Sequence, residues 1–189
     1  SHSIRGGGYI EILPYTSNQS LGINCESGDF NFYYPNNLSD SFSGITIGDS
    51  LKTNGIVSIE DISVNSPTIF NSGKSNISLS EGLSSANKDI TFIVPSNPND
   101  SPIAALKLGS GSLTKQGAGT ITLTSANTYT GSTKIQQGTL NVLGSLENST
   151  ALSVSSGAEY STVTDEIASI SGSGIITLNN SMLTVGADN

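Results

Sequence analysis

The chain has 189 residues, of which Ser, Gly, Asn and Thr make up 91, while charged residues account for 12% and hydrophobic residues for 34%. This composition excludes a helical bundle, because seven basic and fifteen acidic residues cannot cover the polar faces of several helices. The net charge of −8, without clusters of Lys and Arg, argues against nucleic acid as a partner.

Short segments with apolar residues at alternate positions recur along the whole chain. Each segment places two apolar side chains on one face with a small polar residue between them, and this period of two predicts β-strands with one buried face. No window of helical length has apolar residues at helical spacing, so we expect an all-β protein with essentially no α-helix. The expected strands lie at residues 9–13, 29–32, 44–47, 56–59, 76–79, 89–92, 105–108, 120–123, 139–142, 151–154, 175–178 and 182–185.

The segments between these strands are rich in Gly, Asn, Asp and Ser, which accept sharply turned backbone conformations. Two arrangements of such strands compete: an antiparallel sandwich or barrel, and a parallel β-helix whose strands stack from coil to coil. The strands are short, and apolar pairs recur at loose spacings of roughly 20 residues, which is in the range of solenoid repeats. We therefore favour a parallel β-helix of roughly eight to nine coils.

Residues 113–142 read LTKQGAGTITLTSANTYTGSTKIQQGTLNV. This segment resembles the autotransporter-associated β-strand repeat, also called the passenger-associated transport repeat, of bacterial type V secreted proteins. The segments 169–174 and 182–186 look like later coils of the same unit, so the resemblance extends over about residues 109–189. The positions that carry the repeat pattern are Leu113, Gly117, Gly119, Leu123, Tyr129, Gly131, Gly138, Leu140 and Val142.

The front part of the chain, at residues 44–48 and 90–93, is similar to the coils of filamentous haemagglutinin-type exoproteins. Both resemblances imply a right-handed parallel β-helix that is exported through the bacterial outer membrane. We expect a tag remnant and lead-in at 1–8, N-terminal coils at 9–108 and repeat coils at 109–189. Because the repeat would usually continue past its last residues here, we expect the natural protein to be longer.

Catalytic chemistry has few candidate residues in this chain. His2 is the one histidine and lies in the expected tag remnant, so no imidazole is expected to act as a general base. The acidic pairs Glu60–Asp61 and Asp165–Glu166 have no evident basic partner, and we expect them to be solvated charges in turns. Cys25 lacks a neighbour that would lower its pKa. We therefore expect no catalytic residue, no cofactor and no metal site.

Most aromatic residues lie within the first 42 positions. Exposed aromatic rings beside amide side chains can bind carbohydrate, which makes Tyr33, Tyr34, Asn36 and Asn37 the candidate ligand loop. The alternative is that these residues form a bulky cap on the first coil, which the terminal coils of solenoids need in order to avoid end-to-end pairing.

The resemblance to passenger proteins implies a function without catalysis. It points to a segment of a secreted or surface-displayed protein, associated with adhesion and virulence, that serves as a rigid scaffold and aids folding during export. The implied partners are an unidentified host-cell or extracellular protein or glycan and, during export, the outer-membrane translocator barrel. We expect the segment itself not to span a membrane. The alternative is a carbohydrate-binding or polysaccharide-degrading β-helix.

Overall fold

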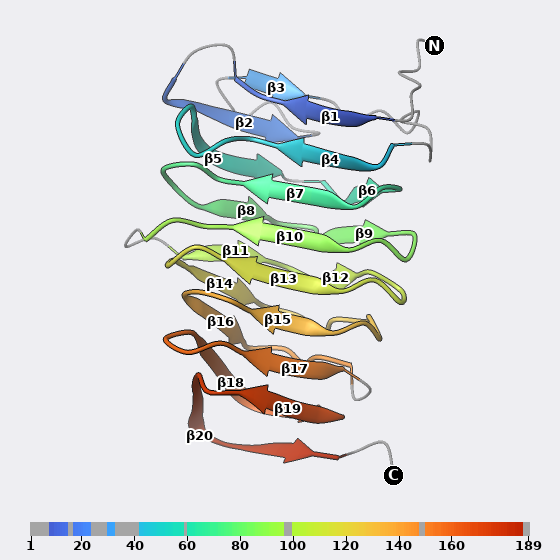
Figure 1. The fold of residues 1–189 in the computed structure, drawn as a ribbon, viewed down its shortest axis with the longest axis vertical. Helices are drawn as coiled ribbons and strands as arrows, with labels where there is room; N and C mark the ends of the chain where they lie inside the picture. Colours follow the sequence, from blue (N-terminus) through green and yellow to red (C-terminus); the bar gives the residue numbers. More distant parts are fainter. Residues whose placement is uncertain are drawn as a thin grey trace.

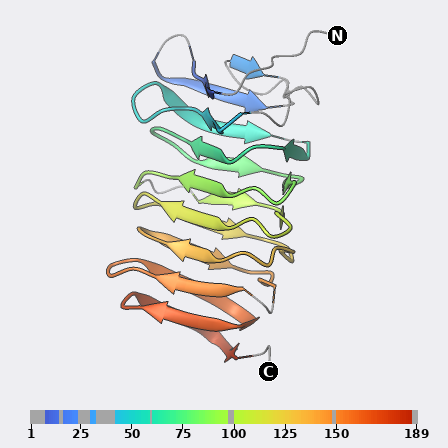
Figure 2. The ribbon, with the colours of Figure 1, turned by 45° about the vertical axis from the view of Figure 1, so that its right-hand side comes forward.

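The structure is a computed structural model and describes residues 8–14, 17–23, 30–32, 42–58, 60–96, 100–147 and 150–186. Within these ranges no residue lies in a helix, and every pairing between named strands is parallel. The chain winds as a parallel β-solenoid, and its first and last coils lie at opposite ends of the stack (Figures 1 and 2). The expected all-β fold and the parallel β-helix are both confirmed.

The first sheet contains one strand from each coil, and its eight strands are joined by seven turns of the solenoid. The number of turns is therefore slightly lower than expected from the sequence. In spatial order the strands are β1 (Tyr9–Ile12), β4 (Gly44–Ile47), β7 (Thr68–Asn71), β10 (Ile90–Ile93), β13 (Leu113–Gln116), β15 (Thr133–Ile135), β17 (Ala151–Val154) and β19 (Ser169–Gly172).

The second sheet has nine strands and runs beside the first along the whole stack. Its strands occur in the reverse spatial order β20-β18-β16-β14-β11-β8-β5-β2-β3. Their bounds are β2 (Gln19–Ile23), β3 (Phe30–Phe32), β5 (Thr53–Ser58), β8 (Ile77–Leu79), β11 (Ser101–Ile103), β14 (Thr120–Leu123), β16 (Thr139–Val142), β18 (Glu159–Ile167) and β20 (Ile175–Val185).

The third sheet is short and belongs to three successive coils that precede β13. It consists of β6 (Ile62–Val64), β9 (Leu83–Ser85) and β12 (Leu106–Lys107). Beyond β12 this side of the solenoid is continued by the single bridges Gly109–Tyr129 and Ala126–Ser145. The cross-section of the solenoid therefore changes along its length.

Alternate residues of each strand point into the solenoid and stack on the equivalent residues of the next coil, as the period of two predicts. The rings of Phe70 and Phe92 stack in this way, with centroids 5.4 Å apart. One inward column of the first sheet contains Ile12, Ile47, Phe70, Phe92, Lys115, Ile135, Val154 and Gly172. Most of this column is apolar, which is how the coils bury a continuous core.

The length of chain in each turn falls toward the C-terminus. Ile90 pairs with Leu113, a step of 23 residues, and Leu113 pairs with Thr133, a step of 20. Thr133 then pairs with Leu152, a step of 19, and Leu152 with Ile170, a step of 18. The turns therefore shorten where the third sheet ends.

No apolar helix of membrane-spanning length occurs in the part of the chain that the structure describes.

Candidate functional site

The candidate ligand loop predicted from the sequence, Tyr33, Tyr34, Asn36 and Asn37, lies outside the described residues, as does Cys25. The role of the candidate ligand loop as a carbohydrate contact or as a cap therefore stays a prediction. Among the residues that are described, no group of three or more His, Cys, Asp and Glu side chains is arranged to hold a metal ion.

The two acidic pairs differ in their surroundings. Glu60 and Asp61 are exposed, as expected for charges in a turn, and so is Glu166. Asp165, in contrast, is only 4% exposed and is not a solvated turn charge. Of the four acidic residues, Asp165 therefore belongs with the buried polar groups of the C-terminal half.

The apolar residues of the repeat pattern all lie in the core. Leu113 is fully buried between Ile90 and Thr133 of the neighbouring coils. Leu123, on β14, is buried in the same way. The remaining apolar repeat positions, Tyr129, Leu140 and Val142, are likewise fully buried. These residues build two successive coils that stack directly on each other.

The glycines of the repeat pattern lie where the backbone of one coil approaches the backbone of another. A Cβ atom at Gly131 would lie 2.2 Å from the carbonyl oxygen of Gly111 in the preceding coil. Gly117 also has a positive φ of 75°, a conformation that other residues adopt at a cost. The same crowding holds at Gly119 and Gly138, whose Cβ atoms would come within 2.3 Å of a backbone oxygen. Side chains at these corners would therefore push the coils apart.

Lys115 is a fully buried cation within the repeat. It points into the solenoid between Phe92 and Ile135 of the adjacent coils. Its Nζ atom donates to the carbonyl oxygens of Gln116 at 2.9 Å, Gly117 at 2.6 Å and Gln137 at 3.2 Å. Burial lowers the pKa of Lys115 to about 8. The side chain thus joins its own turn to the corresponding turn of the next coil.

Asn127 lies on the side of the solenoid where the third sheet has ended, and it is buried. Its Oδ1 atom accepts from the backbone N–H of Leu106 at 2.9 Å. Its Nδ2 atom donates to the carbonyl oxygens of Ser125 and Ser145, each at 2.9 Å. One amide side chain therefore connects three successive coils.

Tyr129 and Thr150 extend this buried network. The Tyr129 hydroxyl lies 2.6 Å from Thr133 Oγ1, and burial raises the pKa of the Tyr129 phenol. Thr150 donates to the carbonyl oxygen of Tyr129 at 3.1 Å. Thr133 and Thr150 are also buried, so these polar groups are satisfied inside the protein.

Asp165 and Tyr160 form the last part of the network. The Tyr160 hydroxyl donates to Asp165 Oδ2, while Asp165 Oδ1 accepts from the backbone N–H groups of Leu146 and Glu166, each at 3.0 Å. Burial raises the pKa of Asp165, and burial together with the nearby carboxylate raises that of Tyr160. The bond to Leu146 again connects two coils.

On the outer face of the second sheet, polar side chains of successive coils bond to one another. Asn141 donates to Thr122 Oγ1 at 3.2 Å, and Asn179 donates to Ser161 Oγ at 2.9 Å. Glu159 accepts from the hydroxyl of Thr139 on one side and from that of Thr177 on the other. This ladder links the coils on the outside as the buried network does on the inside.

The buried side chains described above bond both within their own coil and to a neighbouring coil, as Lys115 does to Gln116 and to Gln137. Lys115 and Asp165 are held by backbone groups and a tyrosine hydroxyl rather than directed into an open cleft. Such an arrangement fixes the stacking register of the coils.

A family model of the passenger-associated transport repeat matches residues 113–142, which run from the start of β13 to the end of β16. No curated protein and no solved structure matches the chain. The matched repeat and the parallel solenoid together fit an autotransporter passenger, and the repeat points to a structural passenger region. The resemblance of the front part to filamentous haemagglutinin-type exoproteins has no support from these comparisons.

Proposed function

We propose that this chain is a rigid, non-enzymatic segment of a secreted or surface-displayed bacterial passenger protein. In this role it presents or forms an adhesive surface, and residues 113–142 help the passenger to fold as it emerges from the outer membrane. Its partners are then an extracellular or host-cell protein or glycan and, during export, the outer-membrane translocator. The matched repeat supports the passenger assignment.

The observation that carries the folding role is the set of buried bonds between coils within and beside the repeat. Lys115 reaches forward to Gln137, and Asn127 reaches both back to Leu106 and forward to Ser145. In a solenoid each coil gains its stability from its neighbours, so folding spreads from a formed coil to the next. A coil that is fixed to both neighbours in one register is suited to start that process.

The mechanism requires no external energy source. A formed coil offers an unpaired strand edge and a row of apolar side chains, and the next coil stacks on both. Each buried hydrogen bond contributes about 1 kcal/mol on balance, and leaving its partner unsatisfied costs more. The repeat therefore rewards the correct register and penalises a shifted one.

The test compares two variants with similar expected losses of stability in the exported full-length protein. Asn127→Ala removes the side-chain bonds that a repeat residue makes to the coils on both sides of it, and Ile62→Ala removes a buried side chain from the third sheet, outside the repeat. Each change should cost about 3 kcal/mol. We expect the amount of folded, protease-resistant passenger at the cell surface to fall several-fold further for Asn127→Ala. Equal surface amounts at equal measured stability would contradict the folding role.

The carbohydrate alternative is not favoured by an observation on the described residues. The hydroxyl and amide groups on the outer face of the second sheet bond to each other across the coils.

A further inference from the structure

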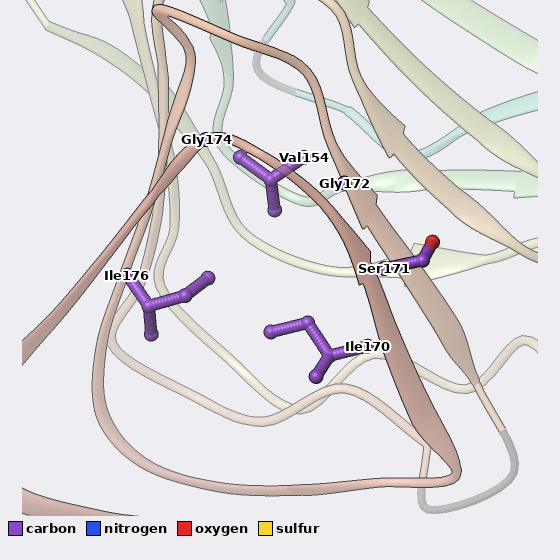
Figure 3. A pocket seen from close by; sticks show the side chains of 6 residues that line it. All are labelled: Val154, Ile170, Ser171, Gly172, Gly174 and Ile176. Carbon is purple, nitrogen blue, oxygen red and sulfur yellow. The ribbon is translucent and has the colours of Figure 1, made fainter.

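The hollow that borders the last coil, with a volume of about 240 Å³, brings no reactive groups together. In Figure 3 the side chains of Val154, Ile170 and Ile176 point toward a common space, and the hydroxyl of Ser171 points away from it. The residues that line the hollow therefore give it an apolar surface. Two groups that can react with each other lie instead on β5, in the coil of β4, β5 and β6.

These groups belong to Asn54 and Gly55, the one Asn-Gly pair of the sequence. Asparagine is a thermolabile residue, because the backbone nitrogen of the following residue can attack the carbon of its side-chain amide. A glycine in the following place has no side chain to obstruct this attack. The pair is therefore a candidate site of spontaneous deamidation.

The reaction needs no enzyme and no reagent other than water. The Gly55 nitrogen loses its proton to the solvent and forms a bond to Asn54 Cγ. The bond from Cγ to Nδ2 breaks, and Nδ2 takes up a proton and leaves as ammonia. The product is a five-membered succinimide ring, which water opens at one of its two carbonyl carbons. Position 54 is left as aspartate or as isoaspartate.

The fold places the two reacting groups in different surroundings. Asn54 and Gly55 form a bulge in β5, where they lie opposite a single residue of β2, Ser20. Asn54 is exposed, so water reaches its amide, whereas Gly55 is buried. Gly55 also has a φ of 104°, a conformation that favours glycine. The carbon that is attacked is thus in contact with water, and the attacking nitrogen lies inside the stack.

The next coil holds the attacking nitrogen in place. The N–H of Gly55 donates to the carbonyl oxygen of Ser72 at 3.0 Å, and Ser72 is fully buried. On the other side of Asn54, the N–H of Lys74 donates to the carbonyl oxygen of Thr53 at 3.0 Å. The Gly55 nitrogen must leave its bond before it can lose the proton and turn toward the Asn54 side chain. The reaction therefore requires this part of the stack to open.

We propose that Asn54 and Gly55 form a modification site at which the chain converts its own asparagine to aspartate and isoaspartate. The following coil, which carries β7 and β8, suppresses the conversion for as long as it stays stacked on β5 (Figure 1). Conversion at position 54 then records the time that this part of the chain spends unstacked. Isoaspartate also lengthens the backbone of β5 by one carbon atom, so a converted chain loses the register of its bulge. This inference is independent of the proposed scaffold role.

The test measures conversion at position 54 of residues 1–189 by peptide mass spectrometry. Folded protein is compared with protein kept unfolded in urea, at the same mildly alkaline pH and the same temperature. We expect Asn54 to convert at least about 10-fold more slowly in the folded protein. Asn54→Gln should abolish the conversion in urea, because attack on the longer side chain would have to close a six-membered ring. Asn71, which is followed by a serine, is the internal control and should convert more slowly than Asn54 in urea.

A matched pair of substitutions tests whether the local stack controls the rate. Ile77→Ala truncates a fully buried side chain of β8 that pairs with Ile56 of β5. Ile135→Ala makes the same truncation at a fully buried position of β15, which contacts neither strand. In folded protein we expect Ile77→Ala to speed the conversion at least about 5-fold and Ile135→Ala to speed it less than about 2-fold. Circular dichroism checks that both variants keep their β-sheet.

Ile77→Val is the milder variant if Ile77→Ala does not fold, and it should speed the conversion in the same direction. An unfolded chain that does not convert at Asn54 overturns the site. Equal rates in folded and unfolded protein overturn the protection by the next coil. Equal acceleration by Ile77→Ala and Ile135→Ala overturns the local control and assigns the reaction to unfolding of the whole stack.

Discussion

The coils from β4 to β12, the first region, and the coils from β13 to β18, the second region, bury their interior in different ways. In the first region the turns take 22 or 23 residues, a third sheet closes the cross-section, and the core column is formed by residues such as Phe70 and Phe92. In the second region the turns take 18 to 20 residues, the third sheet is gone, and polar side chains such as Asn127 and Asp165 are buried.

The difference shows which groups replace the backbone bonds of the third sheet when a coil is shortened. In the first region the backbone groups on this side bond to each other, as in the pairing of β6 with β9. At the end of the third sheet the N–H of Leu106 in β12 is satisfied by Asn127 of the next coil, and in the second region the N–H of Leu146 is satisfied by Asp165. Side-chain oxygens thus take over the bonds that the missing ladder would have made, because buried backbone groups must find partners.

The largest loss of stability is expected from a substitution at the tight corner that precedes each strand of the first sheet. Lys88, Gly111 and Gly131 occupy equivalent places in three successive coils, two residues before their paired strands begin. Gly131→Ala would put its Cβ atom 2.2 Å from the Gly111 carbonyl oxygen, so we expect it to lower the free energy of unfolding by about 4 kcal/mol. Urea denaturation measures the effect.

The matched control for this corner is Lys88→Ala in the first region, where a long side chain already fits and truncation should cost less than about 0.5 kcal/mol. Similar losses for the two variants would contradict the idea that only the shortened coils need glycine here.

A smaller effect is expected from Asn127→Ala. The change leaves the buried N–H of Leu106 without its partner and removes the side-chain bonds to the carbonyls of Ser125 and Ser145, at a cost of about 3 kcal/mol. The Ser145 carbonyl still accepts from the backbone N–H of residue 127. The control is Ser84→Ala on the same side of the first region, where strand pairing satisfies the backbone and the loss should stay within about 0.5 kcal/mol. If Ser84→Ala were as costly in urea denaturation, side chains would support both regions equally.

Much of the fold could be predicted because its signal repeats in every coil. All twelve expected segments fall on strands, and two of them, 175–178 and 182–185, belong to the single strand β20. Some of the missed strands, such as β9 and β15, have few apolar residues, since Ser and Thr occupy part of their length, whereas the missed strands β6 and β7 each contain two. The turn number was overestimated because the first turn takes 35 residues, from Ile10 to Ile45, instead of roughly 20.

The buried polar residues show where a simple alternation rule succeeds and where it fails. Lys115 follows Leu113 by two residues, so the period of two already places it inside. Asp165 could not be placed in this way, because the register of β18 shifts between Thr162 and Thr164. An irregular strand reverses the inward and outward positions that follow it. The repeat was recognisable from its residue pattern, whereas its bonding partners depend on the three-dimensional stacking.

The smallest change in the free energy of unfolding is expected from Lys115→Met. This substitution would give the second region an apolar column like that of the first. The pKa of Lys115 is about 8 in the folded protein and 10.5 is its ordinary value. Below pH 8 the lysine is protonated in both states, and the folded protein bears the cost of burying the charge. Between about pH 8 and 10.5 the unfolded chain binds more protons, so the free energy of unfolding rises with pH.

We therefore expect Lys115→Met to be more stable than the parent protein by about 2 kcal/mol at pH 7, with the advantage shrinking as the pH approaches 10.5. Lys134→Met, on the exposed face of β15, is the control and should change the free energy of unfolding at pH 7 by less than about 0.5 kcal/mol. A variant that is less stable at pH 7 would mean that the three carbonyl bonds of Lys115 outweigh its burial. The expected result instead means that the cost of burying the Lys115 charge outweighs its three carbonyl bonds.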